Sequence, residues 1–255
     1  MTLWARFETA GRAGFGTVNG EMIADHEGDM FDNPRPSGRQ TPVGSVTFRT
    51  PCDPTKMVCL WNNSRTLAAA LRLKAPVEPL YFLKTTTAFH AANHLIPRPK
   101  GYSGRVMFEG ELGVVISKRC KSVPESDAPK YIFGYTCVND VTAIDLLNKE
   151  PSFPQWTRAK NFDGFGVFGP VISTGIDPRQ LRIRAIRSGQ ERQNYSVSDM
   201  FFDPYRLVSL ISKDMTLLPG DIISCGTSAG SGSMNPGTII DIVIDRIGTL
   251  SNTME

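Results

Sequence analysis

The stretch Phe108-Glu-Gly-Glu-Leu-Gly-Val-Val-Ile116 decides how this part of the chain folds, because it is an apolar run that contains two glutamates. In a strand, successive side chains alternate between faces, so Glu109 and Glu111 are expected on the same face. Two carboxylates on one face of a half-buried strand repel each other and lose hydration. They are tolerated where water reaches them, or where a hard cation such as Mg2+, which prefers oxygen ligands, lies between them. A solvated edge-strand face and a cation site both remain open at this point.

A third carboxylate follows a second apolar run. Residues 131–138 (Tyr-Ile-Phe-Gly-Tyr-Thr-Cys-Val) predict a buried strand, and Asn139 and Asp140 stand at its end, where side chains can converge on a ligand. Residues 141–147 predict the start of a short helix, with Asn139 or Asp140 as its N-cap. Capping alone would account for Asp140, but it would not account for the paired glutamates upstream. The third carboxylate therefore favours a metal site.

Length and composition indicate a globular chain and exclude several functional classes. The 255 residues, 40% of them hydrophobic, can form one large domain or two small ones. Lys+Arg 28 against Asp+Glu 25 gives a net charge of +3, and no basic run indicates nucleic acid binding. No apolar stretch approaches the ~18–20 residues that cross a bilayer, and the first ten residues show no signal pattern. We expect a cytoplasmic protein with no nucleic acid and no membrane partner.

The five cysteines, Cys52, Cys59, Cys120, Cys137 and Cys225, are widely spaced and include no CxxC pair. This spacing argues against a zinc site or a redox pair. Cys137 and Cys225 lie within apolar strand-like runs, so we expect them to be small core residues. A reducing cytosol fits this pattern.

The distribution of turn-forming residues predicts many short elements in two units. Gly 23 and Pro 18 are spread along the chain. Residues 1–53 predict a small β-rich N-terminal domain, with a linker near residues 50–54, and residues 54–255 form the main domain. Strand-like alternation recurs at residues 181–185 and 240–244. Together these patterns predict a strand-dominated α+β protein built as a sandwich, roll or barrel.

Two helices are marked by their N-termini. Residues 64–73 have an Ala-rich interior, and Asn63 or Ser64 can act as the N-cap of this helix. The second helix begins at Asp203, an N-cap residue, and has Pro204 at its first helical position. These are the clearest of the few short helices that the sequence predicts.

Eight short stretches recur in the order and spacing of one known family. They are Phe82-Leu-Lys84, Phe108-Glu-Gly-Glu-Leu-Gly113, Gly134-Tyr-Thr-Cys-Val-Asn-Asp-Val-Thr-Ala143, Trp156-Thr-Arg-Ala-Lys-Asn-Phe-Asp163, Gly169-Pro170, Ser198-Asp-Met200, Met215-Thr-Leu-Leu-Pro-Gly-Asp221 and Gly226-Thr227. From about Tyr81 to Glu255 the chain therefore resembles the fumarylacetoacetate hydrolase family, and the first fifty residues match only as a loosely similar small domain. The resemblance implies a mixed β-sandwich roll, usually a homodimer.

The resemblance also implies a metal and a substrate class. Members of the family bind Mg2+, or Mn2+ or Ca2+, through a Glu-x-Glu pair and a later Asp, which fall on Glu109, Glu111 and Asp140. Their substrates are 2-oxo or 2,4-dioxo acids, whose carboxylate and oxo group can chelate one ion. An enolate that develops at the oxo oxygen is then stabilised in place. C–C cleavage, decarboxylation and tautomerisation all pass through such an enolate.

Three further site residues follow from the match. Lys160 corresponds to the family lysine beside the metal and is the catalytic candidate; a surface lysine is the alternative. Thr227 corresponds to the threonine that holds the substrate carboxylate, although a flexible Gly/Ser linker would have a similar composition. The family usually has proline where Ser228 stands. Lys84 is a further candidate for substrate binding, with a structural role as the alternative.

The match fails where hydrolytic members carry a His and a Glu that activate water. The best register places Leu67 and Ala70 at those positions, and neither can accept a proton. An arginine and a glutamine of some members are replaced by Ile144 and Leu147, which would make that side of the pocket more apolar.

Two histidines downstream are candidates for a substitute base. His90 and His94 follow Lys84 and could fold over the pocket as a lid; surface positions are the alternative.

These features support three hypotheses about function. The commonest assignment of the family favours a divalent-metal-dependent hydrolase that cleaves a C–C bond in an acylpyruvate-like 2,4-dioxo acid. The missing dyad favours a 2-oxo acid decarboxylase or a keto–enol isomerase of aromatic catabolism, since these reactions need less activation of water. A non-catalytic protein that binds metal and oxo acid is the third hypothesis.

Overall fold

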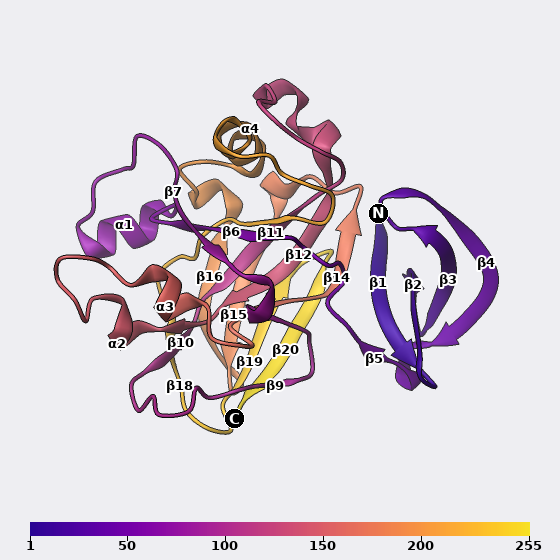
Figure 1. Ribbon diagram of the computed structural model, residues 1–255, viewed down its shortest axis with the longest axis horizontal. Helices are drawn as coiled ribbons and strands as arrows, with labels where there is room; N and C mark the ends of the chain where they lie inside the picture. Colours follow the sequence, from indigo (N-terminus) through magenta and orange to yellow (C-terminus); the bar gives the residue numbers. More distant parts are fainter.

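Strands are the predominant regular elements of the computed structural model, which describes residues 1–255, and short helices lie around them (Figure 1). They form a 12-stranded sheet, a five-stranded sheet and a three-stranded sheet. The predicted strand-dominated α+β architecture is confirmed. None of the helices has the length and apolar character needed to cross a bilayer.

The elements have the following bounds. The large sheet contains β1 (Thr2–Thr9), β2 (Arg12–Asn19), β3 (Met22–Asp29), β4 (Asp32–Pro42), β5 (Thr47–Phe48), β6 (Met57–Trp61), β7 (Leu80–Lys84), β8 (Phe89–His90), β11 (Gly110–Ile116), β12 (Ile132–Asp140), β14 (Gly166–Thr174) and β17 (Ile222–Ser224). The five-stranded sheet contains β9 (Leu95–Ile96), β15 (Arg182–Arg187), β16 (Gln190–Ser196), β19 (Ile239–Ile244) and β20 (Gly248–Met254). The three-stranded sheet contains β10 (Val106–Phe108), β13 (Thr142–Ala143) and β18 (Gly232–Met234).

The helices are fewer and shorter than the strands. The α-helices are α1 (Arg65–Leu71), α2 (Ile144–Leu147), α3 (Trp156–Lys160) and α4 (Pro204–Asp214). Short 3-10 segments lie at Val43–Ser45, Thr86–Ala88, Glu125–Tyr131, Pro178–Gln180 and Val197–Asp199.

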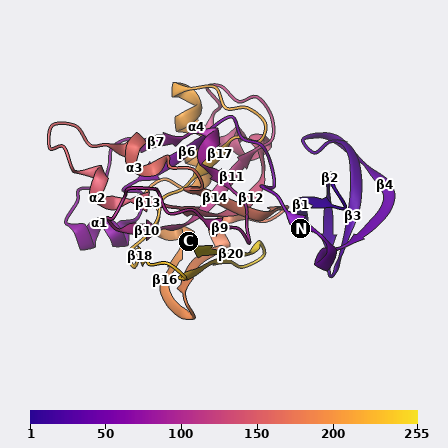
Figure 2. The same cartoon turned by 60° about the horizontal axis from the view of Figure 1, so that its bottom comes forward.

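The N-terminal strands β1–β4 form an antiparallel meander at one end of the molecule (Figures 1 and 2). The meander continues the large sheet, because β1 pairs with β14 from Thr2↔Thr174 to Ala5↔Val171. The N-terminal residues are therefore β-rich, as the sequence predicts. A domain boundary at residue 53 stays a prediction.

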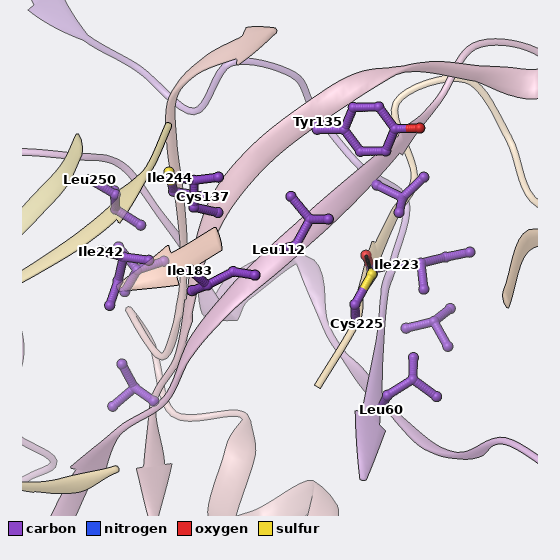
Figure 3. Close-up of a cluster of buried hydrophobic side chains, with 14 of the residues drawn as sticks. Leu60, Leu112, Tyr135, Cys137, Ile183, Ile223, Cys225, Ile242, Ile244 and Leu250 are labelled. Carbon is purple, nitrogen blue, oxygen red and sulfur yellow. Dashed lines mark hydrogen bonds between the residues drawn. The ribbon is translucent and has the colours of Figure 1, made fainter. Parts of the chain in front are cut away.

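One face of the large sheet packs against the five-stranded sheet. Alternation along β11 and β12 directs Leu112 and Cys137 to this face. Figure 3 shows them among Ile183, Ile242 and Ile244 of the second sheet.

All five cysteines are buried and unpaired, which agrees with the expectation that Cys137 and Cys225 are small core residues.

The opposite face of the large sheet carries the acidic side chains. Val115 and Val138 lie there in a smaller apolar cluster with Cys59. Glu111 is four residues from Val115, and Asp140 is two residues from Val138, so strand alternation places both carboxylates on the same face as this cluster. Both residues are fully buried.

Two of the three predicted helix caps agree with the structure. The Ser64 side chain accepts a hydrogen bond from Leu67 N at the start of α1, and Asp203 does the same from Arg206 N at the start of α4. The prediction that Asn139 or Asp140 caps the next helix is wrong. β12 extends through Asp140, α2 begins only at Ile144, and its N-cap position, Ala143, has no side-chain oxygen.

Asp221 joins the start of β6 to the turn before β17. Its Oδ1 accepts hydrogen bonds from Thr55 N at 2.9 Å and Thr55 Oγ1 at 2.7 Å, and its Oδ2 accepts one from Leu218 N at 2.9 Å. Lys56 Nζ lies 2.5 Å from Oδ2, and the Asp221 side chain is fully buried. The parallel pairing of β6 with β17 begins directly after these contacts, at Ile222↔Met57.

We expect Asp221→Ala to lower the free energy of unfolding by about 3–5 kcal/mol, because it removes a fully buried carboxylate and leaves the partly buried Lys56 and several amide groups without an acceptor. Urea denaturation would measure the change. Asp214→Ala is the matched control, since Asp214 is exposed and accepts one hydrogen bond, from Tyr81. Equal stability of the two variants would contradict this account.

Candidate metal centre

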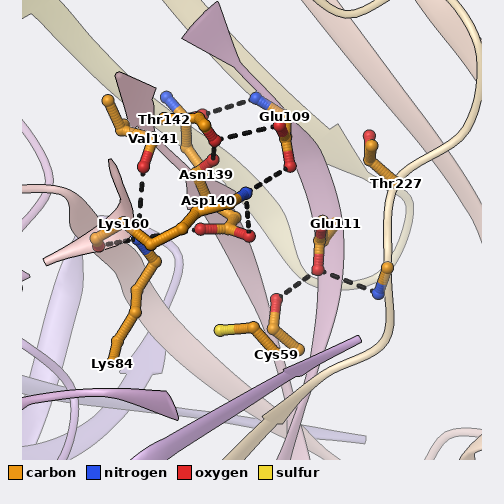
Figure 4. Close-up of polar contacts among 12 residues, drawn as sticks. Cys59, Lys84, Glu109, Glu111, Asn139, Asp140, Val141, Thr142, Lys160 and Thr227 are labelled. Carbon is orange, nitrogen blue, oxygen red and sulfur yellow. Dashed lines mark hydrogen bonds and ion pairs between the residues drawn. The ribbon is translucent and has the colours of Figure 1, made fainter. Parts of the chain in front are cut away.

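Three carboxylates from separate segments converge on the buried face of the large sheet (Figure 4). Glu109, Glu111 and Asp140 each offer one oxygen, and these oxygens lie within 4.8 Å of one another. Antiparallel pairing of β11 with β12 brings them together, because Gly110 is opposite Asn139 and Asp140 N donates to Glu109 O at 2.9 Å. Glu109 lies at the break between β10 and β11 rather than inside a continuous strand.

Polar groups of the chain fix two of these side chains. Glu111 Oε2 accepts hydrogen bonds from Ser224 Oγ at 2.5 Å and from Gly226 N at 2.9 Å. Glu109 Oε1 accepts one from Thr142 Oγ1 at 2.9 Å. Glu111 Oε1, by contrast, is buried and has no hydrogen-bond partner. A buried oxygen without a partner is costly unless a ligand meets it.

Two buried lysines balance part of the negative charge. Lys160 Nζ donates to Glu109 Oε2 at 2.8 Å and to Asp140 Oδ2 at 2.7 Å. Lys84 Nζ lies 2.8 Å from Asp140 Oδ1, as an ion pair rather than an aligned hydrogen bond, and donates to the carbonyls of Val141 and Lys160. Three carboxylates and two ammonium groups leave one net negative charge.

The carboxyl groups differ in their pKa. Burial, followed by the charges of Asp140 and Glu109, raises the pKa of Glu111 to about 8. Burial also raises the pKa of Glu109, against the opposing effect of Lys160. Burial alone would raise the pKa of Asp140, but Lys160 and Lys84 outweigh it and leave that pKa below its ordinary value. Glu111 is therefore the carboxyl group that most lacks a cation.

The residues present fit a divalent cation. Hard cations such as Mg2+, Mn2+ and Ca2+ take carboxylate oxygens as ligands. The centre offers three carboxylates, a surplus negative charge and the unpartnered Glu111 Oε1. Glu109, Glu111 and Asp140 would hold such an ion. Which ion binds stays a prediction.

Thr227 lies beside this centre, in the loop after β17. Its hydroxyl donates to Gly110 O at 3.0 Å and accepts from Gln193 Nε2 at 2.8 Å. The hydroxyl proton is thus already used within the chain. The backbone N–H groups of Thr227 and Ser228 donate no hydrogen bond within the chain, so they are the free donors of this loop.

Lys84 is less available than the sequence suggests. Its side chain is fully buried, and its ammonium group contacts only groups of the chain. This geometry favours a role in positioning Asp140. A substrate contact of Lys84 stays a prediction.

The structure brings no histidine to the acidic centre. His90 and His94 line a separate cavity of about 330 Å3 with residues of the N-terminal meander, including Glu8. His90 Nε2 pairs with Leu95 O at 2.8 Å, and burial lowers its pKa. Of the two alternatives, a lid over the pocket or positions elsewhere, the structure therefore favours the second. α1 carries Leu67 and Ala70, which hold no proton-accepting group.

Sequence reasoning missed the groups that hold the ligands. Ser224 and Thr142 each donate to a glutamate, and Gln193 reaches the loop of Thr227 from another sheet. Thr142 could have been suspected, since it follows Asp140 by two residues. Ser224 and Gln193 give no comparable signal, because their positions depend on long-range strand pairing.

Comparisons with known proteins agree with the fold. Residues 56–255 match the model of the fumarylacetoacetate (FAA) hydrolase C-terminal domain, and residues 3–51 match that of the Rv2993c-like N-terminal domain. The chain therefore belongs to the fumarylacetoacetate hydrolase family, whose characterised members include enzymes.

Three relatives illustrate the similarity. The chain is 40% identical to an uncharacterized protein of Archaeoglobus fulgidus, over 97% of this chain and 94% of that protein. It is 35% identical to the oxaloacetate tautomerase YisK of Bacillus subtilis, over 77% of this chain and 68% of that protein. The crystal structure of 2-hydroxyhepta-2,4-diene-1,7-dioate isomerase from Mycobacterium marinum has a TM-score of 0.91 and 35% identity, over 100% of this chain and 98% of that one.

We expect Glu111→Gln to separate the stability of the metal-free protein from metal binding. Without metal and at a pH above the Glu111 pKa of about 8, the variant should be at least as stable as the wild type, because it removes a desolvated charge that Asp140 and Glu109 repel. With Mn2+ at 100 times its dissociation constant, the wild type should gain about 2.7 kcal/mol, and the variant should gain almost nothing.

Thermal unfolding in EDTA and in excess Mn2+ measures both effects. Glu78→Gln is the matched control, because Glu78 is exposed. A full Mn2+ response in Glu111→Gln would contradict the assignment of this side chain as a ligand.

Proposed function

We propose that the protein is a divalent-cation-dependent enzyme that interconverts the keto and enol forms of a 2-oxo acid. The ammonium group of Lys160, shared between Glu109 and Asp140, carries this proposal. It is a proton donor held against two of the three expected ligands. Balancing charge would be enough reason for Lys160 in a protein that only binds metal, but its place beside two expected ligands also lets it donate a hydrogen bond to a bound substrate.

The charge of the centre suits a 2-oxo acid. The five ionised groups leave one negative charge, so a divalent cation would bring the centre to one positive charge. The carboxylate of a 2-oxo acid would then neutralise it. When bound, the cation would chelate the carboxylate and the oxo group and withdraw charge from the oxo oxygen.

Lys160 stabilises the enolate oxygen in this proposal, and the proton exchanged at the neighbouring carbon comes from or goes to water. Burial lowers the pKa of Lys160, but the charges of Asp140 and Glu109 outweigh this and raise it, so the group stays an ammonium ion. An ammonium ion can donate to the oxygen of a developing enolate and stabilise its charge. The free N–H groups of Thr227 and Ser228 can receive the substrate carboxylate.

Tautomerisation needs fewer groups than hydrolysis. C–C cleavage by water requires a base that activates the water, and such a base contributes typically ~10²–10⁴-fold. Leu67 and Ala70 cannot provide it, and His90 and His94 line another cavity. The named relatives, a tautomerase and an isomerase, support the same preference.

Cleavage of an acylpyruvate-like 2,4-dioxo acid is the second candidate. It would pass through the same enolate and use the same ligands, and the family that the chain belongs to is named after a hydrolase. A water molecule activated by the cation would then have to replace the missing base.

A panel of substrates separates these reactions. We expect Mg2+-dependent loss of the enol absorbance of oxaloacetate, abolished by EDTA and by Asp140→Asn. Pyruvate and acetate formed from acetylpyruvate would instead indicate hydrolysis, and CO2 released from oxaloacetate would indicate decarboxylation. Turnover of none of these substrates would overturn the proposal and support a binding protein.

We expect Lys160→Met to lower kcat by about 10²-fold or more, because it removes the proton donor and keeps the length of the side chain. Binding of Mg2+ should not weaken, since the variant removes a positive charge beside the carboxylates. Steady-state kinetics and calorimetry measure the two effects. Lys149→Met, at an exposed position, is the control. Wild-type kcat in Lys160→Met would rule out the role given to this residue.

A further inference from the structure

The peptide at Gly110 joins the two glutamates to the second sheet. Alternation directs Glu111 to one face of the large sheet and turns Gly110 toward the other. A Cβ at Gly110 would come within 2.9 Å of Ile242 Cδ1 and 3.2 Å of both Ala185 Cβ and Gln193 Oε1. Only a residue without a side chain lets the second sheet approach this closely.

Gln193 of β16 uses this approach to bridge two parts of the site. Its Oε1 accepts from Gly110 N at 3.0 Å, and its Nε2 donates to Thr227 Oγ1 and to Ser228 O, both at 2.8 Å. The amide is 1% exposed. Because Gly110 N requires an acceptor, the orientation of the amide is fixed, and both of its N–H groups are directed at the loop.

We propose that Gln193 is a positioning residue that sets where the loop of Thr227 and Ser228 stands relative to the metal ligands. This inference rests on the proposed function, in which the free N–H groups of that loop receive the substrate carboxylate. Gln193 contacts neither the three carboxylates nor Lys160. It acts by holding Thr227 and Ser228 against Gly110, which lies between Glu109 and Glu111 in the chain.

The strand and the loop depend on Gln193 to different degrees. β11 is held by backbone pairing with both β12 and β17, and Glu109 N donates to Asn139 Oδ1 at 3.0 Å. The segment of Thr227 and Ser228 has no strand pairing and is held by side-chain contacts. Gln193 supplies two of them, Thr227 Oγ1 donates to Gly110 O, and Ser64 and Asp199 contact Ser228 Oγ. Loss of Gln193 should therefore loosen the loop at Thr227 and Ser228 O and leave the metal ligands in place.

Oxalate, a mimic of the pyruvate enolate, can show whether Gln193 affects the loop without affecting the metal ligands. Calorimetry measures Mg2+ binding to the metal-free protein and oxalate binding to the Mg2+-loaded protein. In Gln193→Leu, we expect the dissociation constant of oxalate to rise by about 10–100-fold, the range typical of residues that orient ligand groups. The dissociation constant of Mg2+ should change far less than that of oxalate.

Two more variants complete the test. Gln193→Glu keeps the acceptor for Gly110 N and, when ionised, loses the two donors. It should therefore weaken the binding of oxalate and leave the binding of Mg2+ unchanged. This variant keeps the inference testable even if Gln193→Leu does not fold. Gln190→Leu, at the exposed start of β16, should match the wild type. Hydrogen exchange in the metal-free protein should quicken at residues 226–229 in the Gln193 variants and stay unchanged at residues 111–115.

The outcomes separate this inference from the proposed function. A wild-type protein that binds neither Mg2+ nor oxalate would overturn the proposed function. If the wild type binds both, wild-type oxalate affinity in the Gln193 variants overturns only the role of Gln193. Equal loss of Mg2+ and oxalate binding in these variants would also overturn it, because Gln193 would then build the metal site itself.

Discussion

The repulsion among three close carboxylates, two of them fully buried, is the constraint on which the rest of the site depends. Glu111 and Asp140 lie on the face of the large sheet opposite the five-stranded sheet, and Glu109 lies beside them, partly buried. Ionised groups are poorly solvated in such a place. Lys84 and Lys160 neutralise two of the charges. A divalent cation would compensate the remaining charge, which is centred on Glu111.

The two faces of the large sheet have different roles. One face packs against the five-stranded sheet and forms most of the core, and the other carries the acidic centre. Gly110 is the point at which the two sides meet, because its missing side chain admits Gln193 from the second sheet. The stability of the core and the geometry of the site are therefore linked through one peptide group.

In the proposed function, a cation held by the three carboxylates, the ammonium group of Lys160 and a loop with free N–H groups would together suit an enolate. The resemblance to the family would place the water-activating pair of hydrolytic members on α1, where this chain has Leu67 and Ala70. This absence is why proton transfer is proposed before C–C cleavage.

The sequence by itself determined the strand-dominated fold, the caps at Ser64 and Asp203, and the three acidic residues, because these follow from local periodicity and motif spacing. It placed the cap of α2 wrongly, since cross-strand pairing extends β12 through Asp140. Only the tertiary structure decided that Lys84 is fully buried, that His90 and His94 lie elsewhere, and that Gln193 reaches Gly110. Those contacts join residues far apart in the chain, and no local pattern encodes which strands pair or which faces meet.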